Sequence, residues 1–274
     1  MIAAGAPDTT LVVIGDSLTE NGTWPERLCA EAGWSLQRAG RSGQTSTEVA
    51  VRVGARAVDF VEGETSARGE VAVVPDPLPG PVREHVHTGM DDIRVRGTLG
   101  DRPGCLVHRV SAAADEGWSF CPDAAAPGTP GARRTFLAER LSVPAGAVVV
   151  IWCGRNNPGP EVLEDVAAIA AGLRRDSITR VLVLGVHAAA FEPEGAPGRR
   201  AVLELNQRLA ERFGERFVDV QSALVRATET TDGVAAAPLR SDDVHLSVLG
   251  DAVVARAIRA RVVELGWWHD PQRA

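Results

Sequence analysis

The stretch Leu11-Val12-Val13-Ile14-Gly15-Asp16-Ser17-Leu18 sets the architecture that we expect of this chain. Its branched apolar residues make a run of strand length, and Gly15 ends the run as a turn residue does. Ser17 follows that glycine closely, so the strand would carry the serine hydroxyl to one edge of a sheet. A serine hydroxyl reacts only when a base lies within hydrogen-bond reach. The stretch therefore directs attention to histidine and carboxylate side chains elsewhere in the sequence.

Apolar runs of strand length alternate with helical patterns along most of the chain, which is typical of a parallel α/β sheet. We expect strands at residues 11–14, 35–38, 147–152, 181–186 and 217–220, and helices at 24–32, 47–58, 161–174, 199–213 and 247–265. In open α/β sheets, ligands bind beyond the carboxyl ends of the strands. Ser17, Gly43 and Asn156 each follow such an end, so they are expected to converge on one site.

The alternation is interrupted between residues 61 and 141. Gly and Pro are dense there, helical periodicity is lost, and short alternating runs occur at 70–74, 82–88, 91–98, 105–111 and 117–121. The stretch Gly100–Gly104 is typical of a turn between two strands. We therefore predict a small antiparallel β-rich subdomain at 61–141, inserted into one α/β domain made of residues 1–60 and 142–274.

Composition narrows the class of protein. A chain of 274 residues with 45% hydrophobic residues can bury a sizeable core. The net charge of −7 argues against nucleic acid as the main partner. No apolar stretch approaches the ~20 residues of a membrane span. The first residues lack the basic region of a secretory signal, so a cytoplasmic location is the default expectation.

The absence of two residue types restricts the chemistry. All 29 basic residues are arginine, and the sequence contains neither Lys nor Tyr. Schiff-base chemistry, a Ser-Lys dyad and tyrosine acid/base catalysis are thereby excluded, which leaves histidine as the credible base. The segment 241–247, Ser-Asp-Asp-Val-His-Leu-Ser, offers His245 with Asp242 three residues before it.

No metal or organic cofactor is expected. The four cysteines form no C-x-x-C pair and suggest no zinc site, although Cys105 and Cys121 lie in one segment and could pair in an oxidising compartment. His85 and His87 would share one face of a strand, but no third ligand is evident, so a surface pair is favoured. His187, after the fourth expected strand, is a candidate for the lining of the cleft.

Four short blocks occur in a characteristic order along the chain. They are Gly15-Asp16-Ser17-Leu18, Gly43 within residues 40–45, Gly154-Arg155-Asn156, and Asp242-x-x-His245. Together they resemble the SGNH hydrolases, also called the GDSL esterase/lipase family. The resemblance covers residues 10–58 and 143–266 and implies a flavodoxin-like parallel sheet sandwiched by helices. The family often has Asp after the asparagine of the third block, whereas this chain has Asn157.

The resemblance implies a serine esterase that works through an acyl-enzyme. Ser17 would be the nucleophile, His245 its base and Asp242 the orienting carboxylate, with Asp243 as the rival to Asp242. The oxyanion hole would combine the backbone amides of Ser17 and Gly43 with the side-chain amide of Asn156. The favoured substrate is an acetyl or short-chain ester of a carbohydrate or small natural product.

Other interpretations of these residues stay open. Ser17 could cap a helix, and Gly43 and Asn156 could be turn residues. The same serine could pass its acyl group to an alcohol or amine, which would make the protein an acyltransferase. From another class, the chain could be a carbohydrate-binding or structural protein with an idle cleft.

Overall fold

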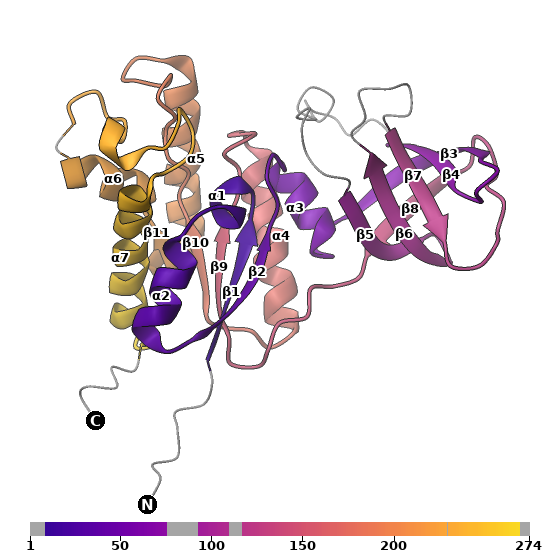
Figure 1. Ribbon diagram of the computed structural model, residues 1–274, viewed down its shortest axis with the longest axis horizontal. Helices are drawn as coiled ribbons and strands as arrows, with labels where there is room; N and C mark the ends of the chain where they lie inside the picture. The colour runs from indigo at the N-terminus through magenta and orange to yellow at the C-terminus, as the bar shows by residue number, and fades with distance from the viewer. Residues whose placement is uncertain (1–8, 76–92, 110–116, 229, 269–274) are drawn as a thin grey trace, which may run out of the picture. The chain divides into compact units, whose positions relative to one another are not determined.

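The computed structural model describes residues 9–75, 93–109, 117–228 and 230–268. The chain divides into two compact units (Figure 1). The first unit contains the residues through 49 and those from 143 onward, and the second contains residues 50–142. The sequence placed the corresponding boundaries at 61 and 141.

The first unit is built on a five-stranded sheet in which every pairing is parallel. Its strands are β1 (Thr10–Gly15), β2 (Ser35–Gly40), β9 (Val148–Trp152), β10 (Val181–Leu184) and β11 (Phe217–Val218). They lie in the order β11-β10-β9-β1-β2. Counted along the chain within this sheet, that is the flavodoxin-like order 2-1-3-4-5, with a topological switch point between β1 and β9. The predicted fold class is confirmed.

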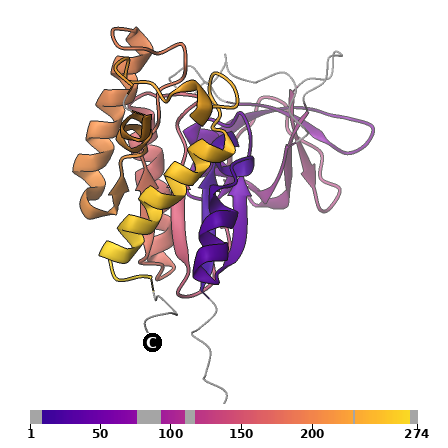
Figure 2. The same ribbon diagram turned by 60° about the vertical axis from the view of Figure 1, so that its left-hand side comes forward.

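Helices cover the sheet, as its apolar strands require. They are α1 (Ser17–Glu20), α2 (Trp24–Ala32), α3 (Ser46–Arg52), α4 (Glu161–Arg175), α5 (Pro197–Phe213), α6 (Val220–Thr228) and α7 (Val248–Glu264), with short 3₁₀ turns at Gly214–Arg216 and Ala237–Leu239. Leu11 and Val13 of β1 belong to a core cluster that includes side chains of α2, α6 and α7. Figure 2 shows α2 and α7 side by side over the sheet. All five residues of β9 are buried, as expected of a central strand covered on both faces.

One predicted helix is wrong in its extent. The sequence indicated a helix over 47–58, but α3 ends at Arg52 and strand β3 (Ala57–Thr65) begins in its place. Gly54 adopts a φ of +72°, which ends the helical path, and from Val58 onward alternate side chains turn inward. The expected strand over 217–220 is also shorter, because Val220 starts the unpredicted helix α6.

The second unit is a closed barrel of antiparallel strands in the order β3-β4-β7-β6-β5-β8. Besides β3, its strands are β4 (Val71–Pro75), β5 (Ile93–Leu99), β6 (Arg102–Arg109), β7 (Gly117–Pro122) and β8 (Arg133–Ala138). Its apolar interior is packed around Phe60, Phe120 and Phe136, whose rings meet edge to face. The antiparallel insertion that the sequence predicted is confirmed, but β3 and β8 were not anticipated.

Several sequence expectations concern this barrel. The turn between β5 and β6 is a two-residue loop that begins with Gly100, whose φ is +63°. Cys105 of β6 pairs in register with Cys121 of β7, and both are free thiols. The possible ligand pair His85 and His87 lies outside the described residues, as does the strand expected at 82–88.

Candidate active site

The three strands at the switch point end level with one another. Gly15, the last residue of β1, pairs with Gly40 at the end of β2 and with Trp152 at the end of β9. Ser17, Gly43 and Asn156 follow these three strand ends within a few residues, as the sequence predicted. Parallel strands put their carboxyl ends at one edge, so the three residues emerge at the same edge of the sheet.

Glycine is required at the turn before Ser17. A Cβ on Gly15 would lie 2.0 Å from the carbonyl oxygen of Trp152 and 2.3 Å from the Thr19 hydroxyl. The chain can therefore turn from β1 into α1 only where no side chain intervenes. Gly154, in the loop after β9, has a φ of +105°, and a Cβ there would meet Val162 at 2.6 Å. Both glycines allow a close approach of backbone at the site.

Ser17, His245 and Asp242 form a continuous chain of hydrogen bonds. The Ser17 hydroxyl lies 2.9 Å from Nε2 of His245, and Nδ1 of the same ring lies 2.7 Å from Oδ2 of Asp242. Ser17 is 6% exposed. The rival carboxylate, Asp243, points elsewhere: its side chain is 78% exposed and lies 4.0 Å from Arg240. The geometry thus pairs His245 with the carboxylate that the sequence favoured.

Asp242 also holds its own loop together. Its Oδ1 accepts the amides of Val244 and His245, both at 2.7 Å, while Oδ2 faces the His245 ring. Burial opposes ionisation of this carboxyl, but the two amides and the imidazole outweigh it and lower the pKa of Asp242 to about 2. Asp242 is therefore an anion at every pH near neutrality, as an orienting carboxylate must be.

Asp16 braces the turn beside Ser17. Its Oδ1 accepts the amide of Leu18 at 3.1 Å, which caps α1, and the side chain is fully buried. Burial raises the pKa of Asp16 to about 6, although the amides of Leu18 and Arg155 act in the opposite direction. The carboxyl contacts backbone amides and is not in the hydrogen-bond chain of Ser17, so its role here is structural.

Two neighbouring asparagines hold the loop that contains Gly43. Asn156 donates its side-chain amide to the carbonyl of Gln44 at 2.8 Å. Asn157 accepts the amide of Ser46 at 2.9 Å and donates to the Ser46 hydroxyl at 3.0 Å. Asn157, where the family often has Asp, thus makes local loop contacts here. Because a primary amide carries two hydrogens, the contact of Asn156 with Gln44 leaves one for another acceptor.

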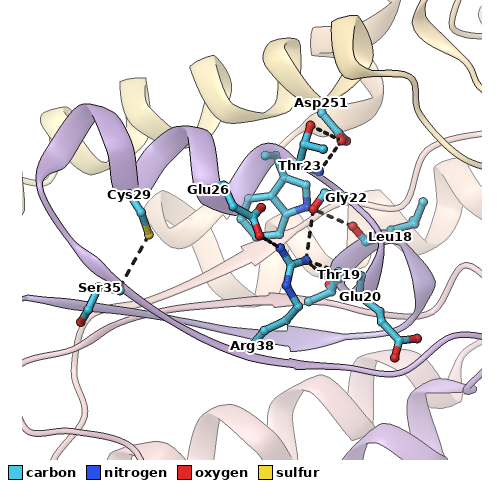
Figure 3. A network of polar contacts seen from close by, with 11 residues as sticks. Leu18, Thr19, Glu20, Gly22, Thr23, Glu26, Cys29, Ser35, Arg38 and Asp251 are labelled. Carbon is cyan, nitrogen blue, oxygen red and sulfur yellow. Dashed lines mark hydrogen bonds and ion pairs between the residues drawn. The ribbon is translucent and has the colours of Figure 1, made fainter.

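Arg38 of β2 holds the segment that follows Ser17 (Figure 3). Its guanidinium donates to the carbonyls of Thr19, Glu20 and Gly22, where α1 ends, and pairs with the carboxylate of Glu26. Such donors satisfy carbonyls that have no partner within the short helix. Thr23, which follows Gly22, is also held in place: Asp251 accepts its backbone amide at 2.5 Å and its hydroxyl at 2.9 Å.

A cavity of about 350 Å³ opens beside Ser17 and His245. Its wall combines polar and apolar surface and includes Leu18, Asn21, Ser241, Leu246 and Asp251. Of the described residues that line it, Asp242 and Asp251 carry carboxylates, and the one basic side chain is that of His245. The polar part of the wall can therefore accept hydrogen bonds from a ligand.

His187 does not line this cavity. It is 1% exposed and lies behind the loop of His245, with its Nε2 at 2.7 Å from the carbonyl of Val244. Two residues that no sequence pattern singled out, Arg155 and Glu192, pack next to His187 and form an ion pair with both side chains over nine-tenths buried. An arginine between Gly154 and Asn156 was the available signal, since a buried arginine requires an anionic partner.

We expect His187 to make stability depend on pH. Burial lowers the pKa of its imidazole from 6.5 to about 4, with Arg155 and His245 acting in the same direction and Glu192 in the opposite one. Between those values the unfolded chain binds the proton and the folded protein does not, so stability falls as the pH falls. The full difference corresponds to about 3 kcal/mol.

The measurement is urea unfolding of the wild type and of His187→Gln at a series of pH values from 7 to 4. All other titrating groups are shared, so the difference between the two proteins isolates His187. The wild type should lose its advantage as the pH falls. A difference that stays constant with pH would show that the ring does not stay neutral in the fold.

Within the described part of the chain, no group of three or more His, Cys, Asp or Glu side chains has the arrangement of a metal site. In the same ranges, no helix is long and apolar enough to cross a membrane.

No protein-family model and no curated protein match this sequence. Solved structures do. A protein of Bacteroides fragilis, described as a candidate acylhydrolase, is 15% identical with a TM-score of 0.50, over 95% of this chain and 89% of that one. An acetylxylan esterase from Geobacillus stearothermophilus, solved as a catalytic mutant, is 14% identical with a TM-score of 0.50, over 94% of this chain and 95% of that one.

A member of the G-D-S-L lipolytic family from Veillonella parvula is 13% identical, with a TM-score of 0.49 over 94% of this chain and 97% of that one. At these identities the likeness to the first two structures concerns the fold. The chain thus has the fold that the resemblance to SGNH hydrolases implied, and that part of the resemblance is confirmed.

Proposed function

We propose that this protein is a serine esterase that hydrolyses an acyl ester through an acyl-enzyme on Ser17. The observation that carries the proposal is the hydrogen-bond chain from Ser17 through His245 to Asp242, with distances of 2.9 and 2.7 Å. Such a chain activates a hydroxyl that is otherwise unreactive. An idle cleft would have no need of a serine, an imidazole and an ionised carboxylate in this order.

In the first half of the proposed reaction, the Ser17 hydroxyl attacks the ester carbonyl. His245 accepts the hydroxyl proton at Nε2, and Asp242 stabilises the resulting imidazolium through Nδ1–H. The imidazolium then gives the proton to the leaving alcohol, which departs and leaves the acyl group on Ser17. In the second half, His245 takes a proton from water as the water oxygen attacks the acyl carbonyl. The bond between the acyl carbon and the Ser17 oxygen then breaks, and the imidazolium returns its proton to that oxygen, which releases the acid and regenerates the serine.

The negative charge that develops on the carbonyl oxygen needs hydrogen-bond donors. We assign this role to the backbone amides of Ser17 and Gly43 and to the side-chain amide of Asn156. The common origin of these three groups at the switch point supports the assignment. Asn156 is held in the loop by Gln44, so its remaining N–H is oriented before substrate arrives.

For the substrate, we propose an acetyl or short-chain ester of a carbohydrate or a small natural product. The cavity beside Ser17 supports this choice, because its carboxylate and amide groups can bind hydroxyl groups, and Leu18 and Leu246 offer apolar surface to a small acyl group. The acetylxylan esterase that shares the fold is named for acetyl esters of a polysaccharide, which is consistent with the same class.

A fluorophosphonate probe tests the proposal. It should label the wild type once, and peptide mapping should locate the label on Ser17, whereas Ser17→Ala should remain unlabelled. Folded wild type that is not labelled would favour a binding or structural protein. Product analysis with 4-nitrophenyl acetate and a competing alcohol or amine then separates hydrolysis from transfer: acetate as the sole product supports the esterase, and an acetylated acceptor identifies an acyltransferase.

We expect Asn156→Ala to lower kcat by ~10² to 10³ with little change in KM, because an oxyanion donor acts mainly in the transition state. Asn157→Ala is the matched control, since Asn157 binds the same loop without an assigned oxyanion role. Steady-state kinetics on a small acetate ester provide the comparison. Equal losses of kcat in the two variants would mean that Asn156 only tethers the loop.

We further propose that the barrel unit is dispensable for turnover of a small ester, because the five proposed site residues all lie in the first unit. The amide of Leu141 donates to the carbonyl of Val53 at 3.2 Å, so the two ends of the barrel segment are neighbours. Replacing residues 54–140 by a short Gly/Ser linker should keep kcat/KM for 4-nitrophenyl acetate within about tenfold of wild type, as the catalytic groups stay in place. A folded but inactive variant would contradict this expectation.

A further inference from the structure

A buried histidine holds the loop that carries His245. Nε2 of His187 lies 2.7 Å from the carbonyl oxygen of Val244. A carbonyl oxygen only accepts, so Nε2 must carry the ring hydrogen. Burial lowers the pKa of His187 to about 4, which keeps the ring neutral with this one hydrogen. Among the described residues, Nδ1 of the ring has no hydrogen-bond partner. Among the described residues, the ring of His187 thus makes a single hydrogen bond, to the carbonyl of Val244.

The contact between His187 and Val244 lies directly beside the proposed base, His245. Val244 directly precedes His245, and its amide is already bound by Asp242. One residue earlier, the carbonyl of Asp243 accepts the amide of Ala190 at 2.7 Å. Two successive carbonyls of the loop are therefore attached to the segment 187–190. A loop held in this way presents the imidazole to Ser17 in a single position.

The same segment is attached to the loop of Asn156 through an ion pair. Arg155 donates to both carboxylate oxygens of Glu192 at 2.8 Å, and it donates to the carbonyl of His187 at 2.8 Å. Glu192 in turn accepts the amide of Ala189 at 2.8 Å. Because Arg155 directly precedes Asn156, one buried network runs from the proposed oxyanion donor to the proposed base.

We propose that His187 is a positioning residue, whose Nε2–H donated to the Val244 carbonyl holds His245 at proton-transfer distance from Ser17, and that the Arg155–Glu192 pair anchors it. The inference rests on the proposed function. It differs from a purely structural role in one respect: loss of the contact should change the rate of the chemical step, because a displacement of about 1 Å at a reacting group can cost about 10² in rate.

Three substitutions separate the two roles. In His187→Gln, the side-chain amide can place an N–H near the position of Nε2. In His187→Asn, the amide stops near the position of Nδ1 and cannot reach Val244. His187→Leu removes the donor altogether. On 4-nitrophenyl acetate, we expect kcat of the Gln variant to remain within about threefold of wild type, and kcat of the Asn and Leu variants to fall about 10²-fold with KM unchanged.

The rate at which the fluorophosphonate labels Ser17 should follow the same order. His108→Leu is the matched control, since it replaces another buried histidine by leucine, in the barrel unit. It should leave kcat unchanged. If the Leu variant does not fold, the kcat values of the Gln and Asn variants still distinguish a positioning role from a purely structural one.

Equal kcat values for the Gln and Asn variants would overturn the inference, as would a loss confined to KM. These outcomes leave the proposed esterase intact, since the wild type would still react with the probe and the ester. A folded wild type that does neither would overturn both the proposed function and the inference.

Discussion

Replacing Ser17 by alanine is expected to lower the rate of ester hydrolysis by ~10⁴ to 10⁶, because the nucleophile and its base act as a unit. The fold should survive, since the substitution removes only a hydroxyl whose partner, His245, is partly exposed to water. Steady-state kinetics with 4-nitrophenyl acetate measure the loss, and the melting temperature verifies the fold. Activity within tenfold of wild type would exclude Ser17 as the nucleophile.

His245→Ala should cause a loss of the same size. The double variant of Ser17 and His245 should be no slower than either single variant, because the first substitution already disables the pair. If the loss of rate in the double variant instead equalled the product of the two single losses, Ser17 and His245 would act independently. The 2.9 Å contact between them would then not contribute to catalysis.

The second large effect is expected from Asp242→Asn, which should reduce kcat by about 10⁴. The amide oxygen can still accept the backbone amides of Val244 and His245, so the loop keeps its shape. The amide nitrogen, however, cannot accept the hydrogen on Nδ1 of His245. The neutral His245 ring then carries its hydrogen on Nε2, which faces Ser17, and this nitrogen can no longer accept the hydroxyl proton.

Asp243→Asn is the control for this variant, because it makes the same change in a neighbouring side chain that is 78% exposed. Its kcat should stay within twofold of wild type, as expected for a group outside the reacting chain. A large loss at Asp243 with little effect at Asp242 would reverse the choice between the two carboxylates.

Much of the first unit could be predicted because β1, β9 and β10 are buried almost throughout and appear in the sequence as continuous apolar runs. The positions of Ser17, Gly43 and Asn156 followed from the rule that parallel strands present their carboxyl ends at one edge. The distance between Ser17 and His245 could not be predicted in this way, since it depends on tertiary packing between the two ends of the chain.

The errors have physical causes. Residues 47–58 combine the helix α3 with the start of the barrel strand β3. Because valine and alanine fit either pattern, the predicted helix extended beyond the end of α3. The strand β8 begins with two arginines and has a short apolar alternation that resembles a loop. The network of Arg155, Glu192 and His187 has no periodicity, because its residues lie in two separate loops and contact a third loop through Val244.

The pairing of β1 with β9 also determines the order in which the protein can assemble. Leu11 lies beside Val148 in the finished sheet, so β1 cannot find this partner until the whole barrel segment has left the ribosome. The barrel pairs β3 with β4, β5 with β6 and β6 with β7 are much closer in sequence, and their loop-closure entropy is smaller. We expect the barrel to form first during synthesis. The proposed site would be completed only later, when the segment near His245 reaches the turn beside Ser17.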